Sequence, residues 1–453
     1  MAARRLRKAW LLLLAGLPIA AVAGAWFFQY RPSLRMSGPD AADAVANLCA
    51  LLGLPLLVVM VVLGTRFPLV ERAFGLDRMM RLHKLLAKAV VSLFLAHALL
   101  RTLRFSMQIG EGWQWDFLVS ADLADWPLAL GRAALCVLLV ASPLALLGGR
   151  LVPWRIWKSA HLLLYPAIAA GFVHARFVSD DLRRLRYSVI WYALAAVLAG
   201  VFVYRVVYRI LRGWRVWHVH AVVPETHDTK TLALCPEDSS GPFLSRRAGQ
   251  FATLRLKRFI SWSEPRPFTI SCGPFADDLR FTIKRSGWFS TAVHGLRPGA
   301  RVLVEGPYGV FCPDFDREPN VVMIAGGVGI TPFLSAIRHA HRSAPKAHIV
   351  LVWGNKTRED IIAADELEEL TKVMWLRVVH VLSQEEAEAG AATEAVSWET
   401  GLVTADLLKR HVEPEGASWY LCGPPKMQKF VLAQLKAAFG VRPRRVHREL
   451  FAW

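Results

Sequence analysis

The sequence predicts a multidomain protein with a six-helix transmembrane bundle, then a small antiparallel β-barrel, then a doubly wound α/β domain. Three observations lead to this prediction. The chain of 453 residues is 54% hydrophobic with a positive mean hydropathy, which is high for a purely soluble protein. Its first half consists of long apolar runs with basic ends. Its second half has short alternating runs, followed by strand-like runs that alternate with helical patterns.

Six apolar runs are each long enough to cross about 30 Å of hydrocarbon at about 1.5 Å per residue. The predicted spans cover residues 9–29, 45–65, 79–104, 126–148, 155–177 and 185–211. The first run opens like a signal peptide, but it is too long for one and ends in the interfacial cluster WFFQY. Basic residues collect before the first span and in the loops 66–81 and 149–158. We therefore expect a multi-pass protein of the plasma or inner membrane with both termini in the cytoplasm.

The charge and the cysteines exclude several other classes of protein. The formal net charge is +19, but the basic residues recur at the ends of apolar runs rather than in one patch. This distribution favours membrane anchoring over nucleic-acid binding. The 6 cysteines are scattered singly, without a C-x-x-C pair. The spacing argues against a disulfide framework, a structural zinc site and an iron–sulfur cluster.

The second half divides near residue 318. Residues 216–310 contain short runs such as VWHVHAVV, QFATLRL and LRFTIKR, bounded by glycine and proline, which is the spacing of a small antiparallel barrel. From residue 319, runs such as NVVMIAGG, HIVLVWG and SWYLCG alternate with helical patterns, as in a doubly wound α/β domain. We therefore predict domains at residues 1–213, 214–318 and 319–453.

Four of the 14 histidines lie within predicted spans, His83 and His97 in the third and His161 and His174 in the fifth. A buried imidazole in lipid is costly unless it is paired or binds a metal. The members of each pair are separated by a rise of about 20 Å, so the two pairs can meet level by level. His83 with His161, and His97 with His174, would then be the axial ligands of two haems. Zinc is the alternative metal, although it prefers more than two ligands.

The helical phase agrees with one pair only. At about 100° per residue His83 and His97 share a face, whereas His161 and His174 lie about 140° apart on a straight helix. We expect a kink or an unwound turn at Pro166 and Gly171, which lie between them, to redirect one ring.

The run RPFTIS, residues 266–271, resembles the R-x-[YF]-[ST] flavin motif of ferredoxin-NADP reductase-like proteins. In such a motif Arg266 forks onto a pyrophosphate, Phe268 offers a ring face to the isoalloxazine and Thr269 hydrogen-bonds flavin N5. A later G-x-x-S run matches the G-x-x-[ST] turn that holds the FAD pyrophosphate through backbone N–H groups. The resemblance implies that FAD is bound by Arg266, Pro267, Phe268, Thr269, Gly287 and Ser290.

The run VVMIAGGVGITPFLSAI combines a strand, a glycine turn and a helix start, which is the order needed to bind a dinucleotide phosphate. Together with LVWGNKTRED and YLCGPPKMQKF, it resembles the nicotinamide domain of the same reductases. The resemblance places Cys422 near the nicotinamide C4, and the alternative for this residue is a buried small hydrophobe. It implies that NAD(P)H is bound by Gly326, Gly327, Gly329, Thr331, Pro332, Lys356, Arg358, Cys422, Gly423 and Pro424.

The coenzyme is NADPH or NADH. Plant-type reductases hold the 2′-phosphate with a Ser-Arg pair, and the run LSQE keeps Ser383 but has Gln384 in place of the arginine. Lys356 and Arg358 would compensate by charge, which favours NADPH.

The chain ends in HRELFAW, which resembles the E-x-[FY] terminus whose aromatic ring covers the flavin. Phe451 fits that ring by its position, and Trp453 is the alternative.

Taken together, the histidine pairs and the nucleotide motifs resemble the ferric reductase/NADPH oxidase superfamily, in a bacterial single-chain form, over almost the whole chain. The resemblance implies two b-type haems in a six-helix bundle. Arg101, one turn beyond His97, would lie near the outer haem, where it would either help oxygen to react or serve as a snorkelling interfacial anchor.

We therefore predict a transmembrane oxidoreductase that passes electrons from cytosolic NAD(P)H through FAD and two haems to an extracytoplasmic small-molecule or ferric-ion acceptor. Ferric-chelate reduction is favoured because the outer loop 105–126 is acidic and attracts cations. The alternative is a constitutive NADPH oxidase that makes superoxide or hydrogen peroxide, favoured by Arg101 and by the lack of room for a calcium-binding regulatory extension. A haem-binding membrane scaffold is the non-enzyme alternative. The expected partners are the lipid bilayer and the acceptor, without nucleic acid or an obligatory protein activator, and the predicted catalytic residues are Cys422, Thr269, Phe451 and Arg101.

Overall fold

The computed structural model of the protein describes residues 2–30, 38–65, 67–110, 112–119, 124–147, 152–208, 214–237, 246–344, 346–386 and 393–449. The chain divides into two compact units, Met1–Ile210 and Leu211–Trp453. The predicted border at residue 213 and the predicted aromatic residues Phe451 and Trp453 lie outside the described residues. The predicted border at residue 318 falls between the sixth and seventh strands, and both borders remain predictions.

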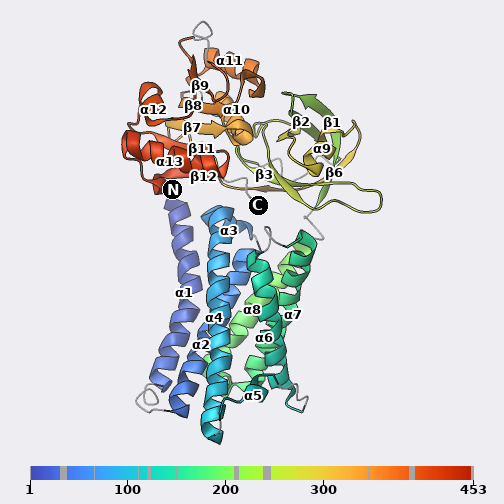
Figure 1. Cartoon of the computed structure of the whole chain (residues 1–453), viewed down its shortest axis with the longest axis vertical. Helices are drawn as coiled ribbons and strands as arrows, with labels where there is room; N and C mark the ends of the chain where they lie inside the picture. Colours follow the sequence, from blue (N-terminus) through green and yellow to red (C-terminus); the bar gives the residue numbers. More distant parts are fainter. Residues whose placement is uncertain are drawn as a thin grey trace. The chain divides into compact units, whose positions relative to one another are not determined.

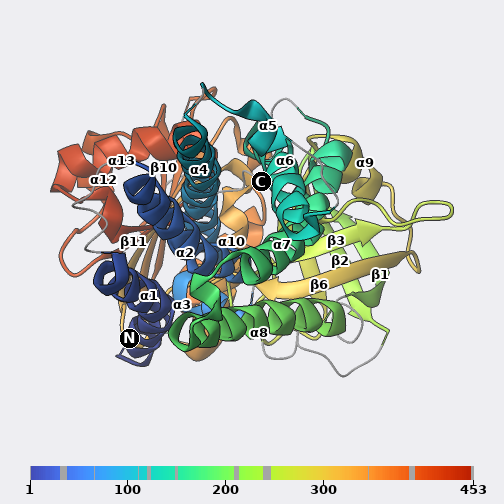
Figure 2. The same cartoon turned by 90° about the horizontal axis from the view of Figure 1, so that it is seen from below.

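The first unit is built from six long helices, drawn in Figure 1 and seen from below in Figure 2. They are α1 (Ala2–Tyr30), α2 (Pro39–Gly64), α4 (Leu76–Ile109), α6 (Trp126–Leu147), α7 (Trp154–Val178) and α8 (Leu185–Tyr208). In the part of the chain that the structure describes, these are the helices long and apolar enough to cross a membrane. Large apolar side chains such as Leu14 and Leu185, 64% and 80% exposed, face outward, as contact with lipid requires. The predicted six-helix bundle is confirmed.

Helix ends in this unit follow from proline and glycine. Pro39 stands in the first turn of α2, where its missing N–H costs nothing, and Pro68 does the same in the short helix α3 (Pro68–Phe74). Gly110 ends α4 in the left-handed conformation with φ 77°. A second short helix, α5 (Trp115–Val119), follows it, and the 3-10 turn η2 (Asp181–Arg183) joins α7 to α8.

Close packing between α2 and α4 depends on one glycine. A Cβ added at Gly53 of α2 would lie only 2.4 Å from the ring of Phe94 on α4. Small residues at helix contacts let two backbones approach in a membrane, and this contact aligns α2 with the helix that carries His83 and His97.

Helix α7 runs unbroken from Trp154 to Val178, through Pro166 and past Gly171. Of the two expected alternatives, a kink or an unwound turn, the unwound turn is therefore absent, and the kink remains a prediction. Inside a bilayer an unwound turn would leave backbone groups unpaired, whereas a proline within a continuous helix frees only a few groups.

The second unit begins with a six-stranded antiparallel sheet, as predicted. Its strands are β1 (Arg215–Pro224), β2 (Thr229–Pro236), β3 (Phe251–Leu256), β4 (Arg266–Thr269), β5 (Leu279–Lys284) and β6 (Arg301–Tyr308), in the order β4-β3-β6-β1-β2-β5. The short helix α9 (Trp288–His294) follows β5. Leu232, Leu254 and Phe281 are fully buried in the core of this barrel. The strand β4, which carries the predicted flavin motif, lies at the edge of the sheet.

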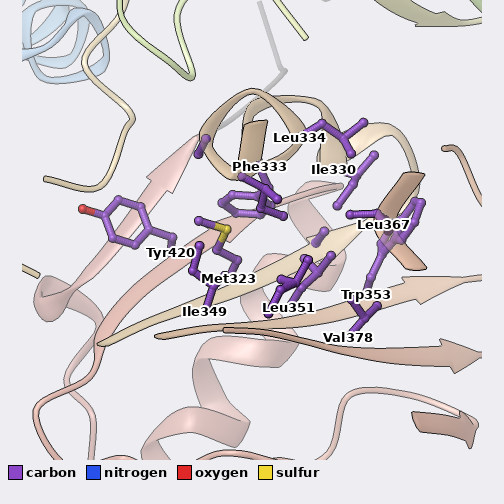
Figure 3. Close-up of a cluster of buried hydrophobic side chains, with 14 of the residues drawn as sticks. Met323, Ile330, Phe333, Leu334, Ile349, Leu351, Trp353, Leu367, Val378 and Tyr420 are labelled. Carbon is purple, nitrogen blue, oxygen red and sulfur yellow. The ribbon is translucent and has the colours of Figure 1, made fainter. Parts of the chain in front are cut away.

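A parallel sheet with helices follows, also as predicted. The strands are β7 (Asn320–Gly326), β8 (His348–Asn355), β9 (Leu376–Leu382), β10 (Val396–Thr400), β11 (Ser418–Cys422) and β12 (Val446–Glu449). The helices are α10 (Thr331–Ser343), α11 (Ala364–Val373), α12 (Ala405–His411) and α13 (Pro425–Phe439). Figure 3 shows the core on one face of this sheet, where Phe333 and Leu334 of α10 lie over Met323, Leu351 and Trp353.

The strand order β10-β9-β8-β7-β11-β12 reverses direction at β7. The chain steps from β7 to β10 towards one edge and then returns to place β11 and β12 on the other side. In open α/β sheets a ligand binds at the carboxyl ends of the two strands that flank such a reversal. The glycine turn after β7 and the run after β11 therefore stand at the expected ligand crevice.

Candidate functional site

The outer histidine pair lines a cavity inside the helical bundle. His97 of α4 and His174 of α7 both face this cavity, whose volume is about 340 Å³. That volume lies within the range of about 300–1,000 Å³ typical of ligand sites. Its wall is otherwise mostly apolar and includes Leu54, Leu57, Phe94, Leu135, Ile168 and Phe172. The structure thus brings His97 and His174 to the same cavity.

Backbone carbonyl groups orient three of the four membrane histidines. Nδ1 of His83 lies 2.9 Å from the carbonyl oxygen of Met60, and Nδ1 of His97 lies 2.8 Å from that of Ala46. Nδ1 of His174 lies 2.9 Å from the carbonyl oxygen of Pro127. Because a carbonyl oxygen only accepts, Nδ1 must carry the proton, and the lone pair of the neutral ring stands on Nε2. Histidines that bind metals are held in this way by their second ring nitrogen.

The inner pair also comes together. The ring centroids of His83 and His161 are 6.3 Å apart, with an angle of 54° between the planes. An atom between the rings at about 2 Å from each nitrogen would need a centroid separation of about 6 Å. Trp157, one turn before His161, stacks on its ring at 5.1 Å. Nδ1 of His161 is buried without a hydrogen-bond partner among the described residues, so stacking rather than a carbonyl orients this ring.

Two glycines that sequence reasoning missed make room for the histidine rings. A Cβ added at Gly131 of α6 would lie 2.4 Å from Nδ1 of His174, and one at Gly64 of α2 would lie 3.1 Å from Cε1 of His83. Glycine inside an apolar span was the available signal, but the sequence does not say which side chain faces it. These two positions are part of the histidine sites.

Arg101 lines the same cavity as His97 and is held by an acidic residue. Its guanidinium forms an ion pair with Asp43 of α2, and Arg104 contacts the same carboxylate at 3.0 Å. Asp181, a carboxylate on the cavity wall, is buried and accepts hydrogen bonds from Tyr30 and from the amide of Gln29. Sequence reasoning missed Asp43 and Asp181, because their partners lie on other helices.

The predicted flavin residues lie along the edge strand β4. Arg266 is exposed at its start and makes no ion pair within the described residues, whereas Thr269 is buried at its end. Phe268 stacks on Phe289 of α9, with centroids 5.6 Å apart and planes 22° apart. Pro267, between Arg266 and Phe268 in the strand, is partly buried. Because Phe289 lies next to Ser290, this stacking joins the two flavin motifs into one site.

Ser290 shapes the turn that precedes α9. Its hydroxyl oxygen accepts from the backbone N–H groups of Ser286 at 2.9 Å and Gly287 at 3.1 Å, and its own proton goes to the carbonyl of Gly287. Nothing lies within 4 Å of a Cβ added at Gly287, so the approach to this turn is open. The geometry makes Ser290 a residue that holds the loop rather than one that presents a free hydroxyl.

The glycine turn after β7 packs backbone to backbone against the end of β11. A Cβ added at Gly329 would lie 2.5 Å from the carbonyl oxygen of Cys422, and one added at Gly423 would lie 3.1 Å from the nitrogen of Gly326. Gly327 has φ 50° with open space beside it. Thr331 begins α10 with Pro332 behind it, and its hydroxyl donates to the carbonyl of Val328 at 3.1 Å. The structure therefore brings the four glycines of the predicted nicotinamide site to the point where the strand order reverses.

Cys422, the last residue of β11, is fully buried. Burial first, and then the charge of Glu449, raises the pKa of its thiol well above the usual value. A thiol with a raised pKa stays protonated, so Cys422 is not a thiolate nucleophile. It is a small group at the carboxyl end of a strand, followed by Gly423 and by Pro424, which immediately precedes α13.

The predicted coenzyme-selecting residues meet at the carboxyl ends of β8 and β9. The backbone N–H of Gln384 donates to the carbonyl of Lys356 at 2.9 Å, which brings the two loops together. Arg358 already has partners, because its Nε lies 3.3 Å from Glu385 and its guanidinium lies 4.5 Å from the ring centre of Trp398. Lys356 is exposed. The positive charge that Arg358 was predicted to add here is therefore partly neutralised by Glu385.

Two parts of the chain match known protein families. Residues 49–172 match the family described as ferric reductase like transmembrane component, and residues 323–433 match the family described as oxidoreductase NAD-binding domain. The fusion of these two domains matches the ferric reductase/NADPH oxidase superfamily. The chain is a multi-pass membrane protein with an NAD-binding oxidoreductase module.

Known relatives match about half of this chain. The chain is 30% identical over 243 residues to a flavohemoprotein of Xylella fastidiosa, which covers 52% of this chain and 59% of the relative. It is 33% identical over 225 residues to the reductase component of a propane 2-monooxygenase from Mycolicibacterium goodii, covering 48% and 62%. The match therefore spans about three fifths of each relative's own length. A solved FAD/NAD-binding domain of nitric oxide dioxygenase from Vibrio cholerae is 24% identical, with a TM-score of 0.46, and covers 52% of this chain and 98% of that one.

Proposed function

We propose that this chain moves electrons from cytosolic NAD(P)H through FAD and two bis-histidine b-type haems to a ferric chelate outside the membrane. The observation that carries the proposal is the arrangement of four histidines at two levels of the bundle, three of them oriented by backbone carbonyls. The flavin would convert a two-electron hydride donor into single electrons that haem iron accepts. The match to a ferric reductase-like transmembrane component supports the choice of acceptor.

The histidines would hold the two haems through Nε2. His83 and His161 would bind the inner one, and His97 and His174 the outer one, inside the apolar cavity. The apolar wall would exclude water from the site. Three of the four rings are kept in place by a hydrogen bond from Nδ1–H to a backbone carbonyl group. The basic ends of the spans support cytoplasmic termini, so the second unit would take its NAD(P)H from the cytosol.

The residues of the barrel would orient the flavin. Exposed Arg266 supplies a guanidinium for a pyrophosphate, and Thr269 at the end of β4 supplies a hydroxyl for flavin N5. Ser290 accepts from the N–H groups of Ser286 and Gly287 and so fixes the shape of the turn before α9, which would face the same pyrophosphate. We assign the ring that covers the flavin to Phe451, with Trp453 as the alternative.

The residues at the reversal of the strand order would orient the nicotinamide. Cys422, small and protonated, would lie beside the ring, while Gly326 and Gly423 let the turns after β7 and β11 pack closely against each other at the predicted crevice. Lys356 favours NADPH by its charge. Glu385 beside Arg358 opposes a 2′-phosphate, so coenzyme choice depends mainly on Lys356.

Oxygen is the second candidate acceptor. The observation that favours it is that Arg101 lines the same cavity as His97 and His174, where a positive charge would attract a developing superoxide anion. The pairing of Arg101 with Asp43 fixes its position but also reduces its net charge.

One experiment separates the candidates. Purified protein is given NADPH under argon, and b-type absorbance is followed before and after addition of ferric chelate or air. Reduction of haem by NADPH supports the electron path, and its absence refutes it. Reoxidation by ferric chelate without oxygen uptake in air identifies a ferric reductase, and the reverse result identifies an oxidase.

A further inference from the structure

The hairpin between β3 and β4 carries an exposed apolar tip. Phe259 is 98% exposed and Ile260 is 91% exposed. No other large hydrophobic side chain among the described residues of the second unit is as exposed as these two. Both lie in a protein whose other unit crosses a membrane.

The tip is a defined turn. The N–H of Arg258 donates to the carbonyl of Ser261 at 2.7 Å, and Lys257 pairs with Trp262 as an antiparallel bridge. Phe259 and Ile260 are thus the two central residues of a tight hairpin turn. Glycine, asparagine and aspartate usually occupy such positions. Two apolar side chains at these positions add almost nothing to the stability of the fold, because they bury almost no apolar surface within the chain.

The residues around the tip are basic and aromatic. Lys257 and Arg258 are exposed, and no acidic residue occurs from residue 251 to residue 263. The guanidinium of Arg258 lies 5.3 Å from the ring centre of Trp288, which is itself 51% exposed. Aromatic and basic side chains together are typical of segments that lie in the headgroup region of a bilayer.

The linker between the last membrane helix and the barrel is short. Six residues separate the end of α8 at Tyr208 from the start of β1 at Arg215, so the first strand starts within about 25 Å of that helix. Trp214 is the last of these six residues, and the centre of its ring lies 4.4 Å from the guanidinium carbon of Arg255 on β3. Val302 of β6 pairs on one side with Trp217, near the start of β1, and on the other side with Leu256, the last residue of β3. The hairpin therefore leaves the sheet close to the start of β1, where the covalent tether from α8 enters the barrel.

We propose that Phe259 and Ile260 insert into the lipid headgroup region of the membrane surface at which α8 ends, with Lys257 and Arg258 binding anionic headgroups. The hairpin then attaches the barrel to the bilayer at a second point besides the covalent tether. This attachment does not depend on which acceptor receives the electrons, nor on whether haem is bound.

The test uses the full-length protein in lipid nanodiscs containing anionic phosphatidylglycerol. A photoreactive benzoylphenylalanine is placed at position 259, and after irradiation the cross-linked species are identified by mass spectrometry. The matched control carries the same group at Val373, which is 61% exposed and is the last residue of α11, a helix drawn away from β3 in Figure 1. We expect a lipid adduct from position 259 and none from position 373.

Other results would overturn the proposal. An adduct between position 259 and a membrane helix would show that the tip docks on protein, and no adduct would show that it faces water. Replacing phosphatidylglycerol with phosphatidylcholine should lower the lipid adduct. The double variant Lys257→Gln, Arg258→Gln, which keeps the apolar tip, should lose that lipid preference, and an unchanged preference would show that these side chains do not contact headgroups.

Discussion

Gly131 of α6 is the position where we expect the smallest substitution to have the largest effect on the outer haem site. In the variant Gly131→Ala the added Cβ would lie 2.4 Å from Nδ1 and 2.6 Å from Cγ of His174. Non-bonded atoms settle at about 3.5–4.0 Å, so the ring must move by about 1 Å. That movement also breaks the 2.9 Å hydrogen bond to Pro127. Because metal–ligand distances tolerate only about 0.2 Å, His174 should no longer bind the outer haem.

The assay is the haem content of purified protein, measured from the dithionite-reduced b-type absorbance per polypeptide. The wild-type chain should carry two haems and Gly131→Ala close to one. The control is Gly200→Ala in α8, where nothing lies within 4 Å of the added Cβ, and it should keep both haems. A Gly131→Ala protein with two haems and an unchanged reduced spectrum would refute the reasoning.

Three further predictions concern the electron path and the nicotinamide domain. His83→Ala should prevent reduction of haem by NADPH, whereas His97→Ala should leave the inner haem reducible and stop only outward transfer; unchanged haem spectra in both variants would contradict the assignment. Cys422→Ala should slow flavin reduction by NADPH about tenfold, equivalent to about 1.4 kcal/mol, with unaltered haem content, and an unchanged rate in stopped-flow absorbance would argue against its place beside the nicotinamide. Burial first, and then a nearby arginine, lowers the pKa of His380 from 6.5 to about 4. The unfolded chain therefore takes up this proton first, so stability is fully present above about pH 6.5 and falls by about 3 kcal/mol towards pH 4. His380→Phe should show a smaller loss of thermal stability over the same pH range, and an equal loss would exclude this histidine as the cause.

Elements that depend on local hydrophobic length and pattern were predictable. The third span, predicted at residues 79–104, lies within α4, and the strand expected in NVVMIAGG is β7. A span or a buried strand is decided by the apolar residues within it, so its neighbours need not be known. The motifs were predictable for the same reason, because a glycine turn between a strand and a helix is read from consecutive residues.

Contacts between distant segments were not predictable in the same way. The phase argument expected a kink or an unwound turn in α7; the helix is continuous, so the turn is not unwound, and His161 and His174 both extend from this one helix. The phase of a straight helix ignores tilt, side-chain rotamers and neighbouring helices, all of which redirect a ring. Similarly, the prediction for Arg358 counted its charge but not Glu385, which lies 27 positions away in the sequence.

By itself, the sequence determined the six spans, the antiparallel and parallel sheets that follow, the four membrane histidines and the order of the nucleotide motifs. These follow from composition, periodicity and short-range spacing, which act within a few turns of chain. Only the tertiary structure decided which carbonyl groups orient the histidines, that Gly131 must lack a Cβ, that Asp43 holds Arg101, and that the apolar turn at Phe259 stands exposed. Each of these is a contact, or the lack of one, between segments far apart in the chain, and close packing in three dimensions sets them.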